Sequence, residues 1–330
     1  MPREHVPERG QALETGVSEA TAIVFPGMGP MRYDETARFM LINRYARELT
    51  AVADEVLGDS LLDRYHEATG DYSEYAQVAF LIVCLALARW AEETSGLSPV
   101  VCAGPSFGGK AAAAYTGVLS VEEAIWLTVQ RARVLERYFS SEHTDVITHS
   151  FARTPPDVLA ALQAELDADG EWHEMSCHVD DDLYMISVRE RVSDRLTASL
   201  RAKGALPLYV MRPPMHCSVF GGLRELMDTE VLAQLTFADP AIPIVADQDG
   251  RLVRDGAGVR AMLSEGFVRP VRWPSVVATL VAQGVQTVYV SGPDSLFGRV
   301  GVTTRNVHTV PISPRTALRP RRRRAFADAA

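Results

Sequence analysis

Ser106 is the residue whose surroundings most clearly suggest chemistry, because it stands between glycines in the stretch GPSFGG at 104–109. The preceding PVVCAG is rich in strand formers, and the alanine run that follows favours a helix. A serine on a sharp turn between a strand and a helix is typical of a nucleophile elbow, where helix N–H groups stabilise a developing oxyanion. The alternative is a glycine-rich turn in which Ser106 only caps the helix.

A serine nucleophile needs a base, and two of the eight histidines are candidates for that role. His216 follows Pro213 and Pro214 in VMRPPMHCS, and the two prolines predict a rigid turn that would present one side chain. His308, in RNVHTVPIS, has the late position in the chain that is typical of α/β-hydrolase histidines. The spacing of these residues does not decide between the two.

Strands and helices alternate along most of the chain. TAIVFPG at 21–27 and PVVCAG read as buried strands, and a helical pattern follows each, the first of them over 37–57. Further strands are predicted at IPIVAD, TVYVSG and VHTVPIS, and further helices at 78–90, VEEAIWLTVQRARVLERYF, GGLRELMDTEVLAQL and around VVATLVAQG. This alternation predicts an α/β fold with a parallel sheet and helices on its faces.

The order of elements changes between 145 and 211, where it becomes β-α-β-β-α-β. That order is typical of a ferredoxin-like unit, here inserted into the larger domain. We therefore expect four parts, namely a disordered leader at 1–20, a large α/β subdomain at 21–143 and 212–314, a small ferredoxin-like subdomain at 144–211, and a basic disordered tail at 315–330.

The composition is that of an ordinary globular protein, with 47% hydrophobic and 23% charged residues among 330. The longest apolar run, VAFLIVCLALARW at 78–90, reaches only about eleven residues before Arg89, too short for a membrane span, so we expect a buried helix. Met1–Glu19 lacks the apolar segment of a signal peptide. The sequence thus predicts a cytoplasmic protein without a membrane partner.

Cysteine usage and charge exclude two further classes of function. The cysteines are scattered, without the paired spacing of a zinc site or a disulfide framework, so we expect buried free thiols and no metal; they are Cys84, Cys102, Cys177 and Cys217. The net charge is −9, yet arginines gather in the tail RPRRRRAFADAA. Such a run could contact nucleic acid, but a solvated disordered end is favoured, and we expect no nucleic-acid partner.

Four motifs together resemble one family. FPGMG at 25–29, GPSFGG at 104–109, PPMHCS at 213–218 and RPVRW at 269–273 have the order and approximate spacing of the acyl-carrier-protein acyltransferases. That family includes malonyl-CoA:acyl carrier protein transacylases and the acyltransferase domains of polyketide synthases. The resemblance runs from about Thr21 to Ile312 and implies an α/β-hydrolase-like large subdomain with a ferredoxin-like insert.

The resemblance also implies how the site works. It makes Ser106 the acyl-accepting nucleophile and His216 its base, in preference to the late histidine. The backbone N–H groups of Met28 and Phe107 would form the oxyanion hole, and a main-chain carbonyl near Gly266 would orient the histidine. The reaction would be a ping-pong transfer through an acyl-serine, with no cofactor bound by the enzyme itself and no metal.

Two residues match family positions near the substrate. Arg131, in TVQRARVL, stands where members that take malonyl groups hold the free carboxylate with an arginine, and a bidentate guanidinium suits a carboxylate. The alternative for Arg131 is an ordinary ion pair. Gln77, in EYAQVAF, falls where the family has a structural glutamine near the site, and the alternative is a plain helix residue.

Several residues depart from the malonyl pattern. Pro105 replaces a histidine, Gly109 replaces a glutamate, Met28 replaces a glutamine, Pro30 stands where serine is common, and Met215 replaces an aromatic residue. These changes imply a less polar and larger pocket. The chain is most similar to stand-alone acyltransferases of macrolactam polyketide pathways, which move aminoacyl or dipeptidyl units between carrier proteins. Malonyl transfer from coenzyme A and hydrolysis of stalled acyl groups remain the alternative reactions.

The expected partners are acyl carrier proteins, as both donor and acceptor, with the acyl group carried on their phosphopantetheine. Carrier proteins are acidic, so an enzyme of net charge −9 needs a local basic patch to attract them. Arg153, Arg299 and Arg212 are the candidates for that patch, each with the alternative of an ordinary solvated arginine. We expect the enzyme itself to be a monomer.

Overall fold

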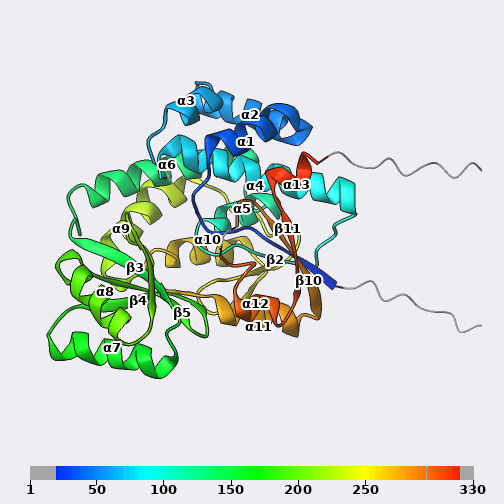
Figure 1. The fold of residues 1–330 in the computed structure, drawn as a ribbon. Helices are drawn as coiled ribbons and strands as arrows, with labels where there is room; N and C mark the ends of the chain where they lie inside the picture. Colours follow the sequence, from blue (N-terminus) through cyan, green and yellow to red (C-terminus); the bar gives the residue numbers. More distant parts are fainter. Residues whose placement is uncertain (1–19, 71, 295, 320–330) are drawn as a thin grey trace, which may run out of the picture.

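The computed structural model describes residues 20–70, 72–294 and 296–319. Two sheets organise them, a six-stranded sheet with helices on both faces and a five-stranded sheet with helices on one face (Figure 1). Residues 1–19 of the predicted leader and the arginines at 321–324 lie outside the described residues, whereas Ala20, expected in the leader, begins the first strand.

The larger sheet holds the first and last strands of the described chain. Its strand order is β11-β10-β1-β2-β7-β8, in which the neighbours from β11 to β7 pair in parallel and β7 pairs with β8 antiparallel. The strands are β1 (Ala20–Val24), β2 (Val101–Ala103), β7 (Ile244–Val245), β8 (Leu252–Val253), β10 (Val285–Ser291) and β11 (His308–Ile312). The predicted parallel sheet is confirmed.

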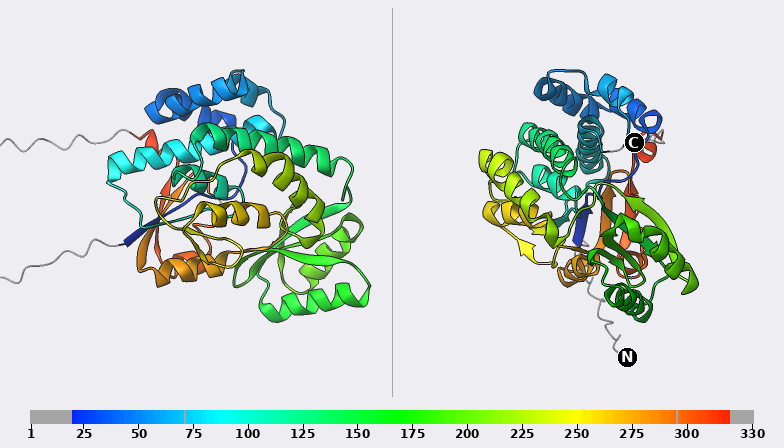
Figure 2. Two further views of the ribbon diagram at one scale, coloured as in Figure 1. Left: turned by 180° about the vertical axis from the view of Figure 1, so that it is seen from behind. Right: turned by 90° about the vertical axis from the view of Figure 1, so that its left-hand side faces the viewer.

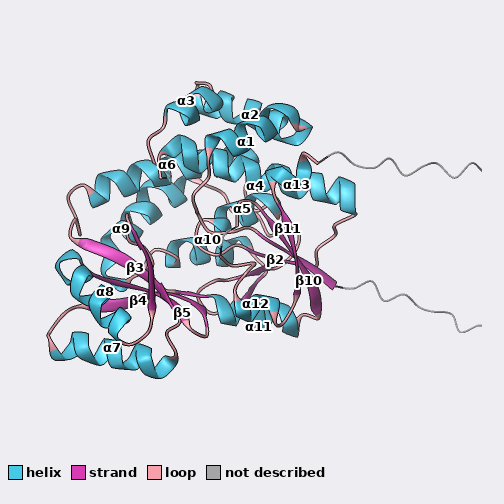
Figure 3. Ribbon diagram, in the orientation of Figure 1, coloured by secondary structure: helices cyan, strands magenta, loops and turns pink. Residues whose placement is uncertain are grey.

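Helices cover both faces of this sheet (Figure 3). One face packs against α4 (Glu74–Ser95), α5 (Gly108–Tyr115), α6 (Val121–Phe139) and, further out, α1 (Tyr33–Ile42), α2 (Arg44–Leu57) and α3 (Leu61–Glu67). The same side carries α9 (Gly221–Leu226) and α10 (Gly256–Glu265). The other face packs against α11 (Trp273–Ala282) and α12 (Gly301–Thr304).

Helix α4 runs through the middle of the larger core. It is long and apolar enough to cross a membrane, but 78% of its most apolar window is buried inside the protein, against α2, α5, α6 and β10. The buried helix predicted around 78–90 is therefore confirmed, and it extends further in both directions than the apolar run itself.

The smaller sheet forms the core of a compact unit beside the larger one (Figures 1 and 2). Its elements are β3 (Val146–Ala152), α7 (Pro156–Ala168), β4 (His173–Asp180), β5 (Leu183–Arg189), α8 (Ser193–Ala202) and β6 (Leu206–Met211). The strand order β6-β3-β5-β4 is antiparallel throughout, and the predicted β-α-β-β-α-β order is confirmed. We call this unit the small subdomain.

The fifth strand of the smaller sheet comes from elsewhere in the chain. β9 (Val271–Arg272) belongs to the RPVRW motif and pairs in parallel with β4. The segment that follows the larger part's helix α10 thus closes the edge of the small subdomain's sheet, which ties the two parts together directly.

Three expectations about helices need correction. The pattern over 37–57 is two helices, because the Asn43 side chain accepts hydrogen bonds from the N–H groups of Tyr45 and Ala46 and starts α2 afresh. GGLRELMDTEVLAQL is α9 followed by a π-helical turn and a 3₁₀ turn. The expected disordered tail begins with a helix, α13 (Pro314–Ala317), which buries Pro314 and pairs Arg315 with Glu35.

Candidate active site

Ser106 lies on a tight turn between β2 and α5, with a φ angle of 54° that residues other than glycine seldom adopt. The glycines on either side of Ser106 allow the backbone of this turn to pack closely against neighbouring backbone. A Cβ atom on Gly104 would lie 2.2 Å from the Gly108 carbonyl oxygen, and one on Gly108 would lie 2.1 Å from that of Phe25. The turn therefore has the strained geometry of a nucleophile elbow.

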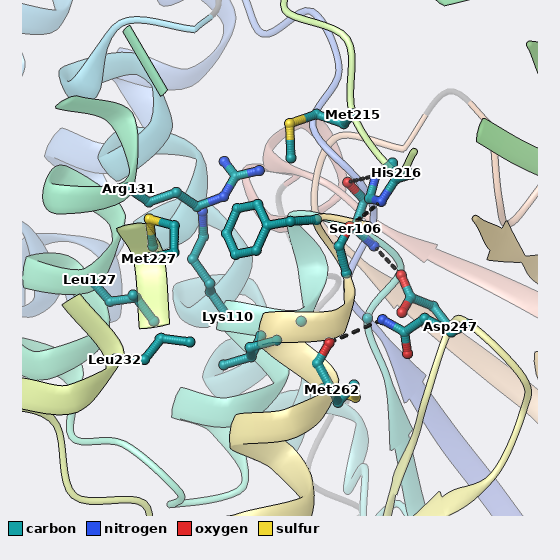
Figure 4. Close-up of a pocket in the computed structure, with 16 residues that line it drawn as sticks. Ser106, Lys110, Leu127, Arg131, Met215, His216, Met227, Leu232, Asp247 and Met262 are labelled. Atoms are coloured by element: carbon teal, nitrogen blue, oxygen red, sulfur yellow. Dashed lines mark hydrogen bonds between the residues drawn. The ribbon is translucent and has the colours of Figure 1, made fainter. Parts of the chain in front are cut away.

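His216 contacts Ser106 directly (Figure 4). Its Nε2 atom lies 2.8 Å from the Ser106 Oγ atom, and its Nδ1 atom lies 2.6 Å from the Gly266 carbonyl oxygen. A carbonyl oxygen can only accept, so Nδ1 carries the proton and Nε2 is left to accept one from the serine hydroxyl. The structure thus brings together the three residues that the resemblance implied, in the tautomer that a general base requires.

Burial keeps His216 neutral. Its side chain is 6% exposed, and burial lowers its pKa from 6.5 to about 4, opposed by the bond to Gly266 and assisted by nearby Arg131. At neutral pH the imidazole is therefore free to take a proton.

His308 lies where it cannot act as a base for Ser106. It begins the edge strand β11, whereas Ser106 follows the end of β2, and both strands run in the same direction in one sheet. The two residues consequently lie toward opposite ends of the sheet. His216 occupies the position of the base instead.

The backbone N–H groups of Met28 and Phe107 are available near the nucleophile. A Cβ atom on Gly27, the neighbour of Met28, would lie 3.8 Å from the Ser106 Cβ atom, so the FPGMG loop runs beside the elbow. Among the described residues, neither N–H group has a hydrogen-bond partner. Both residues line the same cavity as Ser106, which suits the oxyanion role implied for them.

Arg131 is half-buried beside this site and is held by Gln77. Its Nη1 atom donates to the Gln77 Oε1 atom at 3.3 Å, and the Gln77 Nε2 atom donates to the Tyr72 carbonyl oxygen at 2.8 Å. Burial lowers the pKa of Arg131 to about 10, which still leaves it protonated at neutral pH. Within the described residues no carboxylate forms an ion pair with it, so an ordinary ion pair, the alternative role for this arginine, is not present.

Asp247 was not predicted, and it holds the nucleophile's backbone. Its Oδ2 atom accepts a 2.7 Å hydrogen bond from the Ser106 N–H. Burial raises the pKa of this carboxyl group from 3.8 to about 6, opposed by that hydrogen bond. The residue lies just after β7, and the surrounding DQDG reads as a plain turn, so only its place beyond the end of a parallel strand could have marked it.

Lys110 was also not predicted. It lies in the first turn of α5, is 3% exposed, and its Nζ atom has no hydrogen-bond partner among the described residues. Its ammonium lies over the Phe107 ring, 3.7 Å from the centroid, and burial together with Arg131 holds its pKa well below the usual value. The signal was a lysine at a core position among the small residues of GGKAAAAY.

Two cavities meet at the Ser106–His216 pair. The outer one, of about 80 Å³, lies between the larger part and the small subdomain, and its walls include Met28, Tyr209 and Phe297. The inner one, of about 40 Å³, lies behind the serine among α5, α6 and α10 (Figure 4).

The remaining predicted substrate residues differ in which of these cavities they line. Met215 lines both, and Gly109 lines the inner one. Pro105 lines neither; its carbonyl oxygen accepts the Gly108 N–H within the elbow, so it acts on the turn and not on the cavity wall.

The three arginines expected at a docking patch differ in their surroundings. Arg153 and Arg299 are exposed and form no ion pair with any described residue. Arg153 follows β3, and Arg299 precedes α12. The segment of each arginine is hydrogen-bonded to the β4–β5 turn, through the N–H group of Thr154 for the first and of Gly301 for the second. Arg212, in contrast, pairs with Glu190, which neutralises its charge.

The described part of the chain holds neither a cluster of metal ligands nor paired cysteines. It contains no cluster of three or more histidine, cysteine, aspartate or glutamate side chains that could hold a metal ion. The four cysteines are buried and free, as expected from their spacing.

Comparisons with known proteins give a consistent result. Residues 150–211 match a family model described as the VinK acyltransferase small domain. The malonyl CoA-acyl carrier protein transacylase of Salmonella typhimurium is 27% identical over 298 residues, which make up 88% of this chain and 94% of that protein.

Solved structures show the same fold. The malonyl CoA-acyl carrier protein transacylase of Coxiella burnetii matches with a TM-score of 0.79 at 22% identity, covering 91% of this chain and 96% of that one. A malonyl-transacylase in complex with a type II polyketide acyl carrier protein matches with a TM-score of 0.78 at 22% identity, covering 89% and 96%. The chain is thus similar in sequence to the malonyl CoA-acyl carrier protein transacylases and has the fold of their solved structures.

Proposed function

We propose that this protein transfers an acyl group from one acyl carrier protein to another through an acyl ester on Ser106. The observation that carries the proposal is the pair of contacts around His216, 2.8 Å to the serine hydroxyl and 2.6 Å to the Gly266 carbonyl oxygen. This arrangement gives a serine nucleophile with a correctly protonated base and requires no cofactor of the enzyme's own.

The first half of the reaction forms the acyl-enzyme. His216 Nε2 takes the hydroxyl proton while Ser106 Oγ attacks the thioester carbon, and the N–H groups of Met28 and Phe107 bind the resulting oxyanion. Collapse of this intermediate breaks the carbon–sulfur bond. The proton on His216 passes to the departing thiolate of the phosphopantetheine arm, so the histidine is neutral again.

The second half reverses these steps with another thiol. His216 takes the proton of the incoming thiol, whose sulfur attacks the ester carbon, and Ser106 leaves with that proton. Water must stay out between the two halves, since it would hydrolyse the ester. The buried histidine and the narrow inner cavity of about 40 Å³ favour that exclusion.

The acyl group in this proposal is an aminoacyl or dipeptidyl unit, larger than malonyl. Its support is the loss of polar groups at the elbow, where Pro105 and Gly109 replace the family's histidine and glutamate. The competing reaction, malonyl transfer from coenzyme A, has equal support from the similarity to malonyl transacylases and from the half-buried Arg131 beside the serine. Both use the same serine and histidine.

Mass spectrometry of the intact protein distinguishes these reactions. The protein is incubated in parallel with malonyl-CoA and with carrier proteins loaded with aminoacyl or dipeptidyl groups, and the mass added to Ser106 is measured. We expect the carrier-borne groups to label Ser106 and to pass on to a second carrier. Rapid labelling by malonyl-CoA alone would contradict the larger acyl group, and Ser106→Ala serves as the control without a nucleophile.

Carrier docking is proposed at Arg153 and Arg299, because both are exposed cations without an acidic partner in the described structure. Reversal of either charge, Arg153→Glu or Arg299→Glu, should reduce turnover with acyl carrier proteins by about tenfold, since each removes an attraction and adds a repulsion. Hydrolysis of a small acyl-pantetheine thioester should stay unchanged.

Arg212→Glu is the matched control for this test, because Glu190 already neutralises that arginine. Equal loss of carrier-dependent turnover and small-thioester hydrolysis in the first two variants would argue for a general structural effect instead of docking.

A further inference from the structure

The inner cavity is lined by two basic side chains, Lys110 and Arg131, and by mostly apolar ones (Figure 4). Lys110 extends from α5 toward Arg131 on α6, and both line the cavity behind Ser106. The apolar walls come from α6, the turns after α9, and α10 with the residues after it; they are Leu127, Met227, Leu232, Met262, Leu263 and Phe267. This is the region that an acyl chain attached to Ser106 would enter.

Lys110 is not satisfied by the protein around it. Its Nζ atom is buried and finds no hydrogen-bond acceptor among the described residues. The face of the Phe107 ring stabilises one side of the ammonium but accepts no conventional hydrogen bond from it. Burial and the neighbouring Arg131 both disfavour the charged form of this amine and lower its pKa, so an acceptor oxygen bound there would stabilise the ammonium.

The carboxylate that lines this cavity does not neutralise the two cations. Asp247 directs its Oδ2 atom to the Ser106 N–H, and it forms no ion pair with a described residue. Gln77 accepts one hydrogen bond from Arg131 and leaves the other donors of that guanidinium unassigned. Gln248 also lines the cavity, and its Oε1 atom accepts no hydrogen bond from any described residue, so among the described residues no acceptor of this lining bonds to the lysine.

We propose that Lys110, together with Arg131, binds an acceptor oxygen of the acyl chain beyond the thioester carbonyl, a carboxylate or an amide carbonyl. The methylene groups between would lie against the apolar walls. Lys110 is then a specificity-determining residue that selects acyl groups with such an oxygen and disfavours purely apolar chains. This proposal rests on the proposed function, because it names the residues that would bind the far end of the acyl group carried by Ser106.

The test compares acyl-pantetheine thioesters of similar length on the wild type and on Lys110→Met, which keeps the apolar stem and removes the amine. The probes are glutaryl-pantetheine, which ends in a carboxylate, N-acetyl-β-alanyl-pantetheine, which carries an amide carbonyl, and hexanoyl-pantetheine, which has neither. The rate of Ser106 acylation is followed by the mass of the intact protein.

We expect Lys110→Met to slow acylation about 10- to 100-fold with the oxygen-bearing probe that the site selects. This is the usual effect of losing a charged hydrogen bond. Acylation by hexanoyl-pantetheine should be unchanged or faster, which also shows that the variant folds. The more strongly affected of the two oxygen-bearing probes identifies the acceptor as carboxylate or amide. Equal rates in variant and wild type for all probes, or equal slowing of all three, would overturn the proposal.

A binding measurement separates this proposal from the proposed function. Calorimetry of the same probes with Ser106→Ala and with Ser106→Ala/Lys110→Met reports affinity without any reaction. A loss of affinity for the oxygen-bearing probe with the added lysine change supports the subsite even if the wild type transfers nothing between carriers. An unchanged affinity overturns it even if carrier-to-carrier transfer is observed.

Discussion

At the scale of single residues, the environment of His216 sets how the reaction responds to pH. The imidazole must be neutral to accept the proton of Ser106, and burial lowers its pKa to about 4. The neutral form is therefore lost only as the pH falls through that value, whereas an unperturbed histidine would already be protonated near pH 6.

The rate of Ser106 acylation by a small thioester should thus stay nearly constant from pH 8 to about pH 5 and fall below it. Single-turnover acylation measured across this range tests the expectation. His308→Ala should follow the wild-type profile, and His216→Ala should lose about 10²- to 10⁴-fold in rate at every pH. A midpoint near pH 6.5 would show that the histidine is solvated in solution.

Asp247 provides a second test at this scale, through stability. Its pKa is raised from 3.8 to about 6, so its ionisation in the folded state is unfavourable. A group whose pKa is higher in the folded than in the unfolded state contributes stability that is fully present below the unfolded-state pKa. That contribution is lost as the pH rises through the folded-state pKa. The affected window runs from about pH 4 to about pH 6.

Asp247→Asn keeps an oxygen to accept the Ser106 N–H and removes the ionisation. The variant should gain up to about 3 kcal/mol in free energy of unfolding relative to the wild type at pH 8, since each pKa unit corresponds to about 1.4 kcal/mol. The gain should vanish near pH 4. Urea unfolding at both pH values measures it, and a difference that stays constant with pH would show that ionisation of Asp247 is not its cause.

At the scale of elements, the elbow depends on how closely α5 approaches β1. A Cβ atom at Gly108 would lie 2.1 Å from the Phe25 carbonyl oxygen, and backbone on both sides leaves nothing flexible to move. Gly108→Ala should reduce the free energy of unfolding by about 1–3 kcal/mol or more and abolish Ser106 acylation.

Gly221→Ala is the matched control for that change. Gly221 begins α9, and a Cβ atom there would meet no heavy atom within 4 Å. This substitution should leave the free energy of unfolding unchanged or slightly increased, because alanine favours a helix. Thermal unfolding of both variants decides the point; similar losses in the two would mean that backbone crowding at the elbow is not the reason.

The sequence predicts the elements far better than the contacts that complete the site. Ser106 and His216 were found because local motifs carry them, and the small subdomain because its order of strands and helices is regular. Asp247 was missed because its role is a hydrogen bond between residues 141 positions apart. The break at Asn43 was missed because the apolar pattern continues through it, while a side-chain cap interrupts the helix.

At the scale of the whole molecule, the proposed catalytic pair follows strands of two different sheets. Ser106 follows a strand of the larger sheet, whereas His216 follows β6 of the small subdomain. From the same subdomain, the Ser176 hydroxyl on β4 donates a 2.8 Å hydrogen bond to the Met215 carbonyl oxygen, next to the histidine. The small subdomain therefore holds the segment of His216, while the Gly266 carbonyl oxygen at the end of α10 holds its ring.

Ser176→Ala tests this dependence. Loss of the bond should slow Ser106 acylation about fivefold, corresponding to about 1 kcal/mol, by loosening the position of His216. Thr148→Val is the control, because it removes another buried hydroxyl bond, to Ser187, within the same sheet. Both variants should unfold at similar urea concentrations; equal slowing of acylation in both would indicate a general effect of weakening the sheet.

The β4–β9 pairing links the surroundings of His216 directly to both parts of the molecule. Gly266, whose carbonyl oxygen fixes the proton on His216, lies five residues before β9, and β9 is bonded to the small subdomain's edge. Gly266 itself caps the end of α10 of the larger part, and α11, which follows β9 directly, packs on the larger sheet, so the carbonyl oxygen that orients His216 is held from both parts of the molecule. A rotation between the two parts would have to break the β4–β9 hydrogen bonds, so the pairing that joins them also fixes the distance between the histidine and the serine.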